Sequence, residues 1–230
     1  MSTLATRKSA LIAGSTGLIG HHVMQTLIAH PQYKEVRVIT RRPLPIEDPK
    51  VQVIQVDFAH LQDYKECFQV DEIYCCLGTT MKKAKTKEAF RQVDYKYPLQ
   101  LAQLGKEMNT KRYLLVSSMG ADPSSRFFYN QVKGELEQAL EALHLPATHI
   151  FRPSLLLGKR EEFRLGEEIG GLLAKGLGFA FQGPLKKYRP IQGETVAQAM
   201  VHTAQLDRTG THHYLSNEIA EIVASEITNQ

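Results

Sequence analysis

The stretch Ser9 to Gly20, SALIAGSTGLIG, constrains the fold more than any other part of the chain. A short apolar run leads into glycines at positions 14, 17 and 20, and a helical pattern follows. Glycine lets the backbone turn tightly and approach a phosphate, while the N–H groups at a helix start attract negative charge. The stretch therefore predicts a strand, a turn and a helix that bind a dinucleotide pyrophosphate, although any strand-to-helix turn can use glycine.

The following residues alternate between apolar strand-like runs and amphipathic helical patterns. β-branched and other apolar residues predict strands at 9–13, 36–40, 51–56, 73–77, 113–116 and 149–152. Apolar side chains at helical spacing predict helices at 17–30, 87–108 and 126–143. This alternation is typical of a parallel sheet covered on both faces, so we expect an α/β fold with a doubly wound Rossmann sheet, forming one domain over residues 1–230.

The C-terminal part of the chain is less regular. We expect residues 154–230 to contribute a small lobe on the substrate side of the sheet. The pattern predicts a loop at 155–158, a helix at 161–175, a glycine- and aromatic-rich stretch at 176–183, a helix at 194–206, an edge strand at 212–215 and a closing amphipathic helix. Arg189 is either an anion contact near the cleft or a surface residue.

Composition limits the classes of protein to which the chain can belong. The 230 residues are 43% hydrophobic, which is enough to bury one sizeable core. The net charge of +4 comes from scattered lysines and arginines, a distribution that does not indicate a nucleic-acid partner. We find neither an apolar run long enough to span a membrane nor a secretory signal, and we therefore expect a cytoplasmic protein without membrane insertion.

Cysteine and histidine positions indicate neither disulfides nor a metal. Two of the three cysteines, Cys75 and Cys76, are adjacent within an apolar run, which favours buried, reduced thiols. The histidine pairs at 21–22 and 212–213 lack the further ligands of a zinc site. We therefore expect no metal.

The end of the second predicted strand indicates which dinucleotide binds. A cofactor with a free ribose 2′-hydroxyl usually meets an acidic residue there. Here Thr40 is followed by Arg41 and Arg42, whose guanidinium groups suit a 2′-phosphate. This favours NADP(H) over NAD(H), although an Arg-Pro sequence can also simply end a strand. Asp57, just past the third strand, is either an acceptor for the adenine amino group or an ordinary loop carboxylate.

Candidate catalytic residues follow the fifth predicted strand. Ser117 and Ser118 end that strand, and Tyr129 and Lys133 lie four residues apart, on one face of a helix. Carbonyl reduction needs a proton donor beside the carbonyl oxygen, and a phenol serves when a nearby ammonium favours its ionised form. A serine hydroxyl can orient the carbonyl. The Tyr-x-x-x-Lys spacing is common by chance. The interpretation of Tyr129 and Lys133 as catalytic therefore depends on their position shortly after the strand that ends in Ser-Ser.

The motifs together resemble the short-chain dehydrogenase/reductase superfamily in its atypical or extended branch. The strings that carry the resemblance are AGSTGLIG, VITRRP, VDF, CCLGTT, LLVSSMGAD, YNQVK and FRPSLLLG, which span nearly the whole chain. More narrowly, CCLGTT, VDYKY, SSMGAD and YNQVKGELE are similar to the Tat-interacting-protein group of oxidoreductase-like proteins and its bacterial relatives.

The resemblance implies an NADP(H)-binding Rossmann fold and a set of site residues. It implies that the pyrophosphate turn is lined by Gly14, Ser15, Thr16, Gly17, Leu18 and Ile19. It assigns further cofactor contacts to Arg41, Arg42, Asp57, Phe58, Leu77, Gly78, Thr79, Ser117, Lys133, Arg152 and Pro153. It gives the catalytic positions to Ser118, Tyr129 and Lys133.

Two residues depart from the pattern of the superfamily. Ala13 stands where many extended members have Thr, and Asp94 stands where many keep an Asn that supports a proton relay to the lysine. A carboxylate at position 94 can pair with Lys133 and change how the proton is delivered.

We expect an NADP(H)-dependent oxidoreductase that transfers a hydride between nicotinamide and a small carbonyl or alcohol, with Tyr129 as acid and base. The alternative is a regulatory protein that binds NADPH without turnover and presents a surface to a protein partner. A sugar-nucleotide epimerase is a further variant, but the small C-terminal lobe leaves little room for that substrate.

Overall fold

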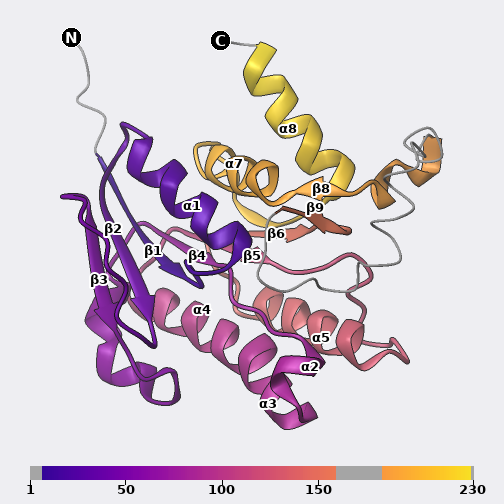
Figure 1. Ribbon diagram of the computed structural model, residues 1–230, viewed down its shortest axis with the longest axis horizontal. Coiled ribbons are helices and arrows are strands. Elements are labelled where there is room, and N and C mark those ends of the chain that lie inside the picture. The colour runs from indigo at the N-terminus through magenta and orange to yellow at the C-terminus, as the bar shows by residue number, and fades with distance from the viewer. Residues whose placement is uncertain (1–6, 159–182, 229–230) are drawn as a thin grey trace.

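A computed structural model describes residues 7–158 and 183–228, which build a parallel sheet with helices on both faces (Figure 1). The sheet has seven strands in the order β3-β2-β1-β4-β5-β6-β9. Their bounds are β1 Lys8–Ala13, β2 Tyr33–Thr40, β3 Val51–Gln55, β4 Glu72–Cys75, β5 Arg112–Val116, β6 Ala147–Arg152 and β9 Gly210–Leu215. A short pair, β7 (Leu156–Leu157) and β8 (Ile191–Gln192), lies outside this sheet. The fold confirms the predicted Rossmann class.

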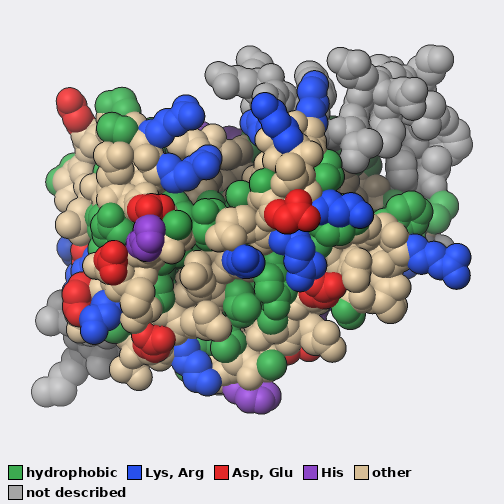
Figure 2. Space-filling view, turned by 90° about the horizontal axis from the view of Figure 1, so that it is seen from below, with side chains coloured by type: hydrophobic (Ala, Val, Ile, Leu, Met, Phe, Trp, Pro, Cys, Tyr) green, Lys and Arg blue, Asp and Glu red, His purple; other side chains and the backbone are tan. Residues whose placement is uncertain are grey.

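Helices form one layer on each face of the sheet. α1 (Leu18–Ala29), α7 (Gly193–Thr203) and α8 (Ser216–Thr228) cover one face. α4 (Tyr97–Glu107), α5 (Phe128–Ala142) and the 3-10 segment η1 (Phe58–Phe68) cover the other (Figure 1). The space-filling view from below that second layer shows acidic and basic side chains interspersed (Figure 2).

The central strand β1 shows why both layers are needed. Ala10 and Ile12 pack into the cluster under α1 and α7, whereas Leu11 and Ala13 pack into the cluster under α4 and α5. All four side chains are fully buried. Successive side chains of a strand point to opposite faces, so a strand covered on both sides must be apolar throughout.

The strand order reverses beside β1. The chain passes from β1 to β2 and β3 on one side of the sheet, and then crosses to β4 on the other side. In such sheets the ligand crevice lies outside the carboxyl ends of the strands at this switch point. The predicted site residues follow the ends of β1, β2, β3, β4, β5 and β6, which places them along that edge.

The helix predicted at 87–108 is not continuous. It is divided into α3 (Lys87–Arg91), a π-helical turn η2 (Gln92–Lys96) and α4. Pro98, in the first turn of α4, has no N–H for the carbonyl of Asp94, and its ring crowds that carbonyl. The N–H of Tyr97 instead donates to the oxygen of Gln92, which is the π-type bond.

Other predicted elements agree with the structure to within a few residues. Periodicity and turn residues did not predict η1, the short helix α2 (Met81–Ala84), the β7–β8 pair or the 3-10 segment η4 (Gly183–Tyr188). The helix predicted at 161–175, and the glycine-rich stretch at 176–183 apart from its last residue, lie outside the described residues. Within the described part of residues 154–230, β9 extends the main sheet and α7 packs on α1.

Candidate active site

The turn after β1 is closed by contacts that exclude side chains. Gly14 has a φ of +92°, and a Cβ there would lie 2.6 Å from the carbonyl oxygen of Cys76. A Cβ on Gly20 would lie 2.1 Å from the oxygen of Gly14. The N–H of Gly17 donates to that same oxygen at 3.0 Å. The first turn of α1 therefore packs directly on the loop, and the loop packs on the end of β4.

The start of α1 fits an anion. Its N-cap residue, Gly17, makes no side-chain cap, and no acidic residue lies in the first turn. Ser15 is 3% exposed, and its Oγ has no hydrogen-bond partner in the described chain. Thr16 is exposed, Leu18 is half-buried and the Ile19 side chain lies in the core. Uncapped helix N–H groups beside an unpartnered hydroxyl suit the pyrophosphate of a dinucleotide.

The two arginines after β2 are exposed at the edge of the crevice. Thr40 Oγ1 accepts from the Arg42 N–H at 3.4 Å, and Gln55 donates to the Arg41 carbonyl at 3.3 Å. Neither guanidinium forms an ion pair with the described residues. Both are thus available for a phosphate.

Asp57 and Phe58, after β3, have local contacts. Asp57 accepts from the Ala59 N–H at 2.9 Å and pairs with His60 at 2.8 Å. The bond from the Ala59 N–H is the main reason why the pKa of Asp57 lies below its ordinary value. Phe58 is buried against the ring of Tyr97. The structure therefore gives Asp57 a capping function whether or not it also meets adenine.

Ser118 lies at the start of the loop that joins β5 to α5, and Tyr129 lies in the first turn of α5. Within the described residues, the buried Oγ of Ser118 has no hydrogen-bond partner. Tyr129 is half-buried, with its ring 5.6 Å from that of Phe90. The loop is held against α5 at Gly134, where a Cβ would lie 2.2 Å from the backbone nitrogen of Pro123. This close approach fixes the serine relative to the helix that carries the tyrosine.

Lys133 lies one helical turn beyond Tyr129 and is paired with Asp94. Its side chain is 3% exposed, and Nζ lies 2.9 Å from Asp94 Oδ1. This is a charge contact, because Oδ1 has no partner with hydrogen-bond geometry. Asp94 Oδ2 accepts from the Thr79 N–H at 2.7 Å, in the loop after β4 that also contains Leu77 and Gly78. Asp94 therefore joins the predicted cofactor loop to the predicted catalytic lysine.

Ser117 and Arg152 belong to a second polar cluster, centred on Glu137. Ser117 Oγ donates to Glu137, Arg152 forms an ion pair with it, and His213 Nε2 lies 3.5 Å from Oε2. Burial alone would raise the pKa of Glu137, but bonds from His213, Arg152 and Ser117 outweigh it and lower that pKa. Pro153 is buried, and its carbonyl accepts from the Met119 N–H at 3.0 Å. The cluster ties α5 to β5, β6 and β9.

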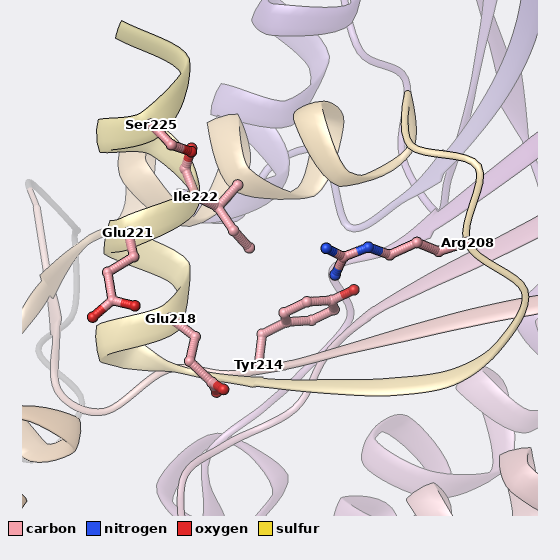
Figure 3. A pocket seen from close by; sticks show the side chains of 6 residues that line it. All are labelled: Arg208, Tyr214, Glu218, Glu221, Ile222 and Ser225. Carbon is pink, nitrogen blue, oxygen red and sulfur yellow. The ribbon is translucent and has the colours of Figure 1, made fainter. Parts of the chain in front are cut away.

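Sequence reasoning did not identify Glu137, although it lies four residues beyond Lys133 on the same helical face. Nothing in its local sequence distinguishes it from a surface glutamate. A groove away from the crevice was also not anticipated. It lies between β9 and α8, where Arg208 points toward Tyr214 and Ile222 (Figure 3). Neither feature contains a residue that the sequence assigned to catalysis.

Comparison with known proteins identifies a family and two sets of relatives. The profile described as NAD dependent epimerase/dehydratase family matches residues 10–138, more than half of the chain. The chain is 35% identical over 202 residues to "Protein FMP52, mitochondrial" of Debaryomyces hansenii, covering 85% of this chain and 87% of that protein. It is 39% identical over 164 residues to "Protein HTATIP2" of Rattus norvegicus, covering 70% and 67%. These matches confirm the resemblance to the extended branch and the Tat-interacting-protein group.

Solved structures share the fold at low identity. The Bordetella bronchiseptica enzyme WbmH in complex with NAD+ has a TM-score of 0.69 at 16% identity, covering 96% of this chain and 81% of that chain. MoeE5 in complex with UDP-glucuronic acid and NAD has a TM-score of 0.69 at 17% identity, covering 96% and 82%. The likeness supports the Rossmann fold.

The prediction of a cytoplasmic protein is wrong by these comparisons, because relatives at 30% identity or more are named mitochondrial proteins. The prediction depended on the absence of a long apolar run. Mitochondrial targeting uses amphipathic, arginine-rich segments instead, which such a search does not detect. No helix in the described residues has the length and hydropathy needed to cross a bilayer.

Proposed function

Since the chain belongs to the NAD-dependent epimerase/dehydratase family, we propose that it is an NADP(H)-dependent oxidoreductase acting on a small carbonyl or alcohol substrate. The observation that supports the proposal is that Ser118 follows the carboxyl end of β5, on the same edge of the parallel sheet as the glycine turn after β1, and that the next helix carries Tyr129 and Lys133. Ser118 presents an unpartnered hydroxyl, and Lys133 lies one helical turn from Tyr129. A dinucleotide bound at the turn would extend along this edge toward them.

The cofactor would be held mainly by backbone and basic groups. The uncapped N-terminus of α1 and the Ser15 hydroxyl would contact the pyrophosphate. Arg41 and Arg42 would contact the 2′-phosphate that distinguishes NADP(H) from NAD(H), because a guanidinium donates two aligned bonds to phosphate oxygens. The acidic residue that would favour a free 2′-hydroxyl is absent from the three residues that follow β2.

Three protein side chains would donate the proton, orient the carbonyl oxygen and stabilise the charge that forms. A bound reduced nicotinamide supplies the hydride that the carbonyl carbon accepts. Tyr129 donates its hydroxyl proton to the carbonyl oxygen, so that the products are the alcohol and the tyrosinate, which regains a proton from solvent. Ser118 donates a hydrogen bond to the same oxygen and orients it. Lys133 binds the cofactor ribose and stabilises the charge left on Tyr129.

A Tyr129→Phe variant tests the proposal. We expect its NADPH affinity to stay within about twofold of the native value, because the phenol makes no contact on which pyrophosphate binding depends. Its turnover should fall by about 10²–10⁴-fold, which is the contribution of a positioned proton donor. The measurements are calorimetric titration with NADPH and NADPH consumption across a panel of aldehydes, ketones and quinones.

Tyr64→Phe is the matched control, since Tyr64 lies in η1, packs against the core and is assigned no contact with cofactor or substrate, and it should keep native turnover. Retained turnover in Tyr129→Phe would refute the role of the phenol. Native protein that binds NADPH but consumes none with any compound would favour a cofactor-sensing protein instead.

A further inference from the structure

The large hydrophobic side chains that are exposed in the described part of the chain lie on connections that follow the carboxyl ends of strands. They are Met81 at 40% exposure, Phe127 at 75%, Leu185 at 51% and Tyr188 at 47%. Met81 opens α2, which follows β4, and Phe127 is the N-cap residue of α5, which follows β5. Leu185 and Tyr188 belong to η4, which precedes β8. Exposed apolar side chains are normally scattered over a protein surface, so this common location calls for a physical reason.

These side chains belong to the segments 81–87, 124–129 and 185–189, which together we call the crevice-edge surface. β4, β5 and β6 are adjacent and parallel, so the connections that follow them leave the same edge of the sheet. The Nζ atom of Lys87 lies 5.2 Å from the centre of the Phe128 ring, which places the first segment beside the second.

The third segment is held at the end of β6. The Ser154 hydroxyl, two residues beyond β6, donates to the Arg189 carbonyl at 2.5 Å. The Ile191 N–H donates to the Leu155 carbonyl at 2.9 Å. The end of η4 is therefore fixed at the same edge as the other two segments.

Cations lie next to each of the four apolar side chains. The crevice-edge surface contains eight of the chain's 28 lysines and arginines and none of its 24 acidic residues. The eight are all exposed: Lys82, Lys83, Lys85, Lys87, Arg126, Lys186, Lys187 and Arg189. Two acidic residues border the surface, Glu88 in α3 and Asp122, whose carboxylate already accepts two bonds from Ser124. The surface is therefore strongly positive.

This combination favours a lipid surface over a protein or a nucleic acid. A protein interface has an apolar core from which lysine is depleted, whereas here each apolar side chain is bordered by lysine or arginine. A nucleic acid attracts cations but offers no apolar phase to an aliphatic side chain. A bilayer accepts single aliphatic and aromatic side chains at its headgroup boundary, while neighbouring lysines and arginines contact the lipid phosphates.

We propose that the crevice-edge surface binds the surface of bilayers that contain anionic lipids. The four apolar side chains enter the headgroup region, and the eight cations contact the lipid phosphates. The crevice then opens toward the bilayer. This inference uses surface residues alone, so it stands or falls independently of the proposed oxidoreductase function.

Sedimentation with lipid vesicles tests the electrostatic part. We expect the full chain to sediment with phosphatidylcholine vesicles that contain about one third phosphatidylglycerol, and not with phosphatidylcholine alone. About 1 M salt should release most of it, because the Debye length falls to about 3 Å.

A matched pair of double variants locates the contact. Lys186→Gln with Lys187→Gln should lower the partition coefficient at least about tenfold, because each cation at an anionic surface contributes roughly fivefold. Lys34→Gln with Lys111→Gln removes two exposed cations at the amino ends of β2 and β5 and should change it by less than about twofold.

A tryptophan reporter tests the apolar part. The chain contains no tryptophan, so Phe127→Trp introduces a single indole at the most exposed of the four positions. Its emission should shift to shorter wavelength on anionic vesicles, and lipids with brominated acyl chains should quench it. Gln32→Trp, at an exposed position just before β2 on the opposite edge, should show neither change.

Native protein that sediments with neither kind of vesicle, or equally with both, would overturn the proposal. Sedimentation without any change in Phe127→Trp emission would also overturn it, since the surface would then be a general site for polyanions such as nucleic acids or acidic proteins. Equal losses in the two double variants would place the contact elsewhere on the molecule. NADPH titration of the same preparations tests the proposed function separately.

Discussion

At the scale of single residues, the site combines groups that are left without partners and groups that are fully paired. The Ser15 and Ser118 hydroxyls are buried without partners among the described residues, an arrangement that costs stability unless a ligand completes it. Arg41 and Arg42 are exposed and unpaired in the described chain. The proposed cofactor contacts are assigned to Ser15, Arg41 and Arg42, and the proposed contact with the substrate carbonyl is assigned to Ser118.

The double variant Arg41→Ala with Arg42→Ala tests the cofactor preference. We expect the difference between NADPH and NADH binding free energies to narrow by at least about 1 kcal/mol, because charge-assisted bonds to the 2′-phosphate are lost. Calorimetric titrations with both nucleotides measure it. Lys34→Ala, an exposed position at the opposite end of β2, should leave the difference unchanged. An unaltered ratio in the double variant would show that the arginines do not select the nucleotide.

At the scale of elements, the position of α1 is decided by backbone contact with the turn before it. Gly20 lies so close to Gly14 that no side chain fits between helix and loop, whereas a Cβ on Gly17 would keep 3.3 Å from the Gly14 oxygen. Between α3 and α4 it is Pro98 that decides the backbone path, because it produces the π-helical turn that contains the buried Asp94. In both places one backbone position, Gly20 or Pro98, decides how the neighbouring elements pack.

A matched pair of glycine variants tests this placement. Gly20→Ala should lower the free energy of unfolding by about 1–3 kcal/mol, because its Cβ meets a carbonyl oxygen that cannot move without shifting the turn. Gly17→Ala should cost less, about 0.5–1 kcal/mol for a poorer N-cap. Urea unfolding of both cofactor-free proteins gives the two values. Equal losses would mean that the turn and helix are not in the predicted contact.

At the scale of the whole molecule, the sheet carries buried polar groups toward its β9 edge and at the amino ends of its strands. His149 on β6 is fully buried, stacked on His212 of β9 and bonded to Tyr214 at 3.0 Å. Burial lowers its pKa from 6.5 to about 4, with His212 and the nearby Arg112 adding to the effect. Folding therefore keeps this imidazole neutral where the unfolded chain would protonate it.

This makes stability depend on pH. Between pH 7 and pH 5 the unfolded chain takes up a proton at residue 149 that the folded protein excludes, so the free energy of unfolding should fall by about 2 kcal/mol from this group. His149→Gln should flatten the decline measured by urea unfolding, whereas His21→Gln, at an exposed position on α1, should not. A His149→Gln protein with the native pH profile would contradict the assignment.

The sequence by itself determined the order of the seven strands of the main sheet and of the long helices between them, the glycine turn, and the residues at the strand ends, because periodicity and turn chemistry are local properties. Placement of Tyr129 and Lys133 followed from helical spacing for the same reason. The family resemblance had already indicated that Asp94 can pair with Lys133, which the structure confirms. Only the tertiary structure decided that Asp94 also accepts from Thr79, that Glu137 holds Arg152 and Ser117, and that the 87–108 helix is interrupted. Those contacts join segments distant in sequence, or depend on which face of a helix is covered, and no local pattern contains that information.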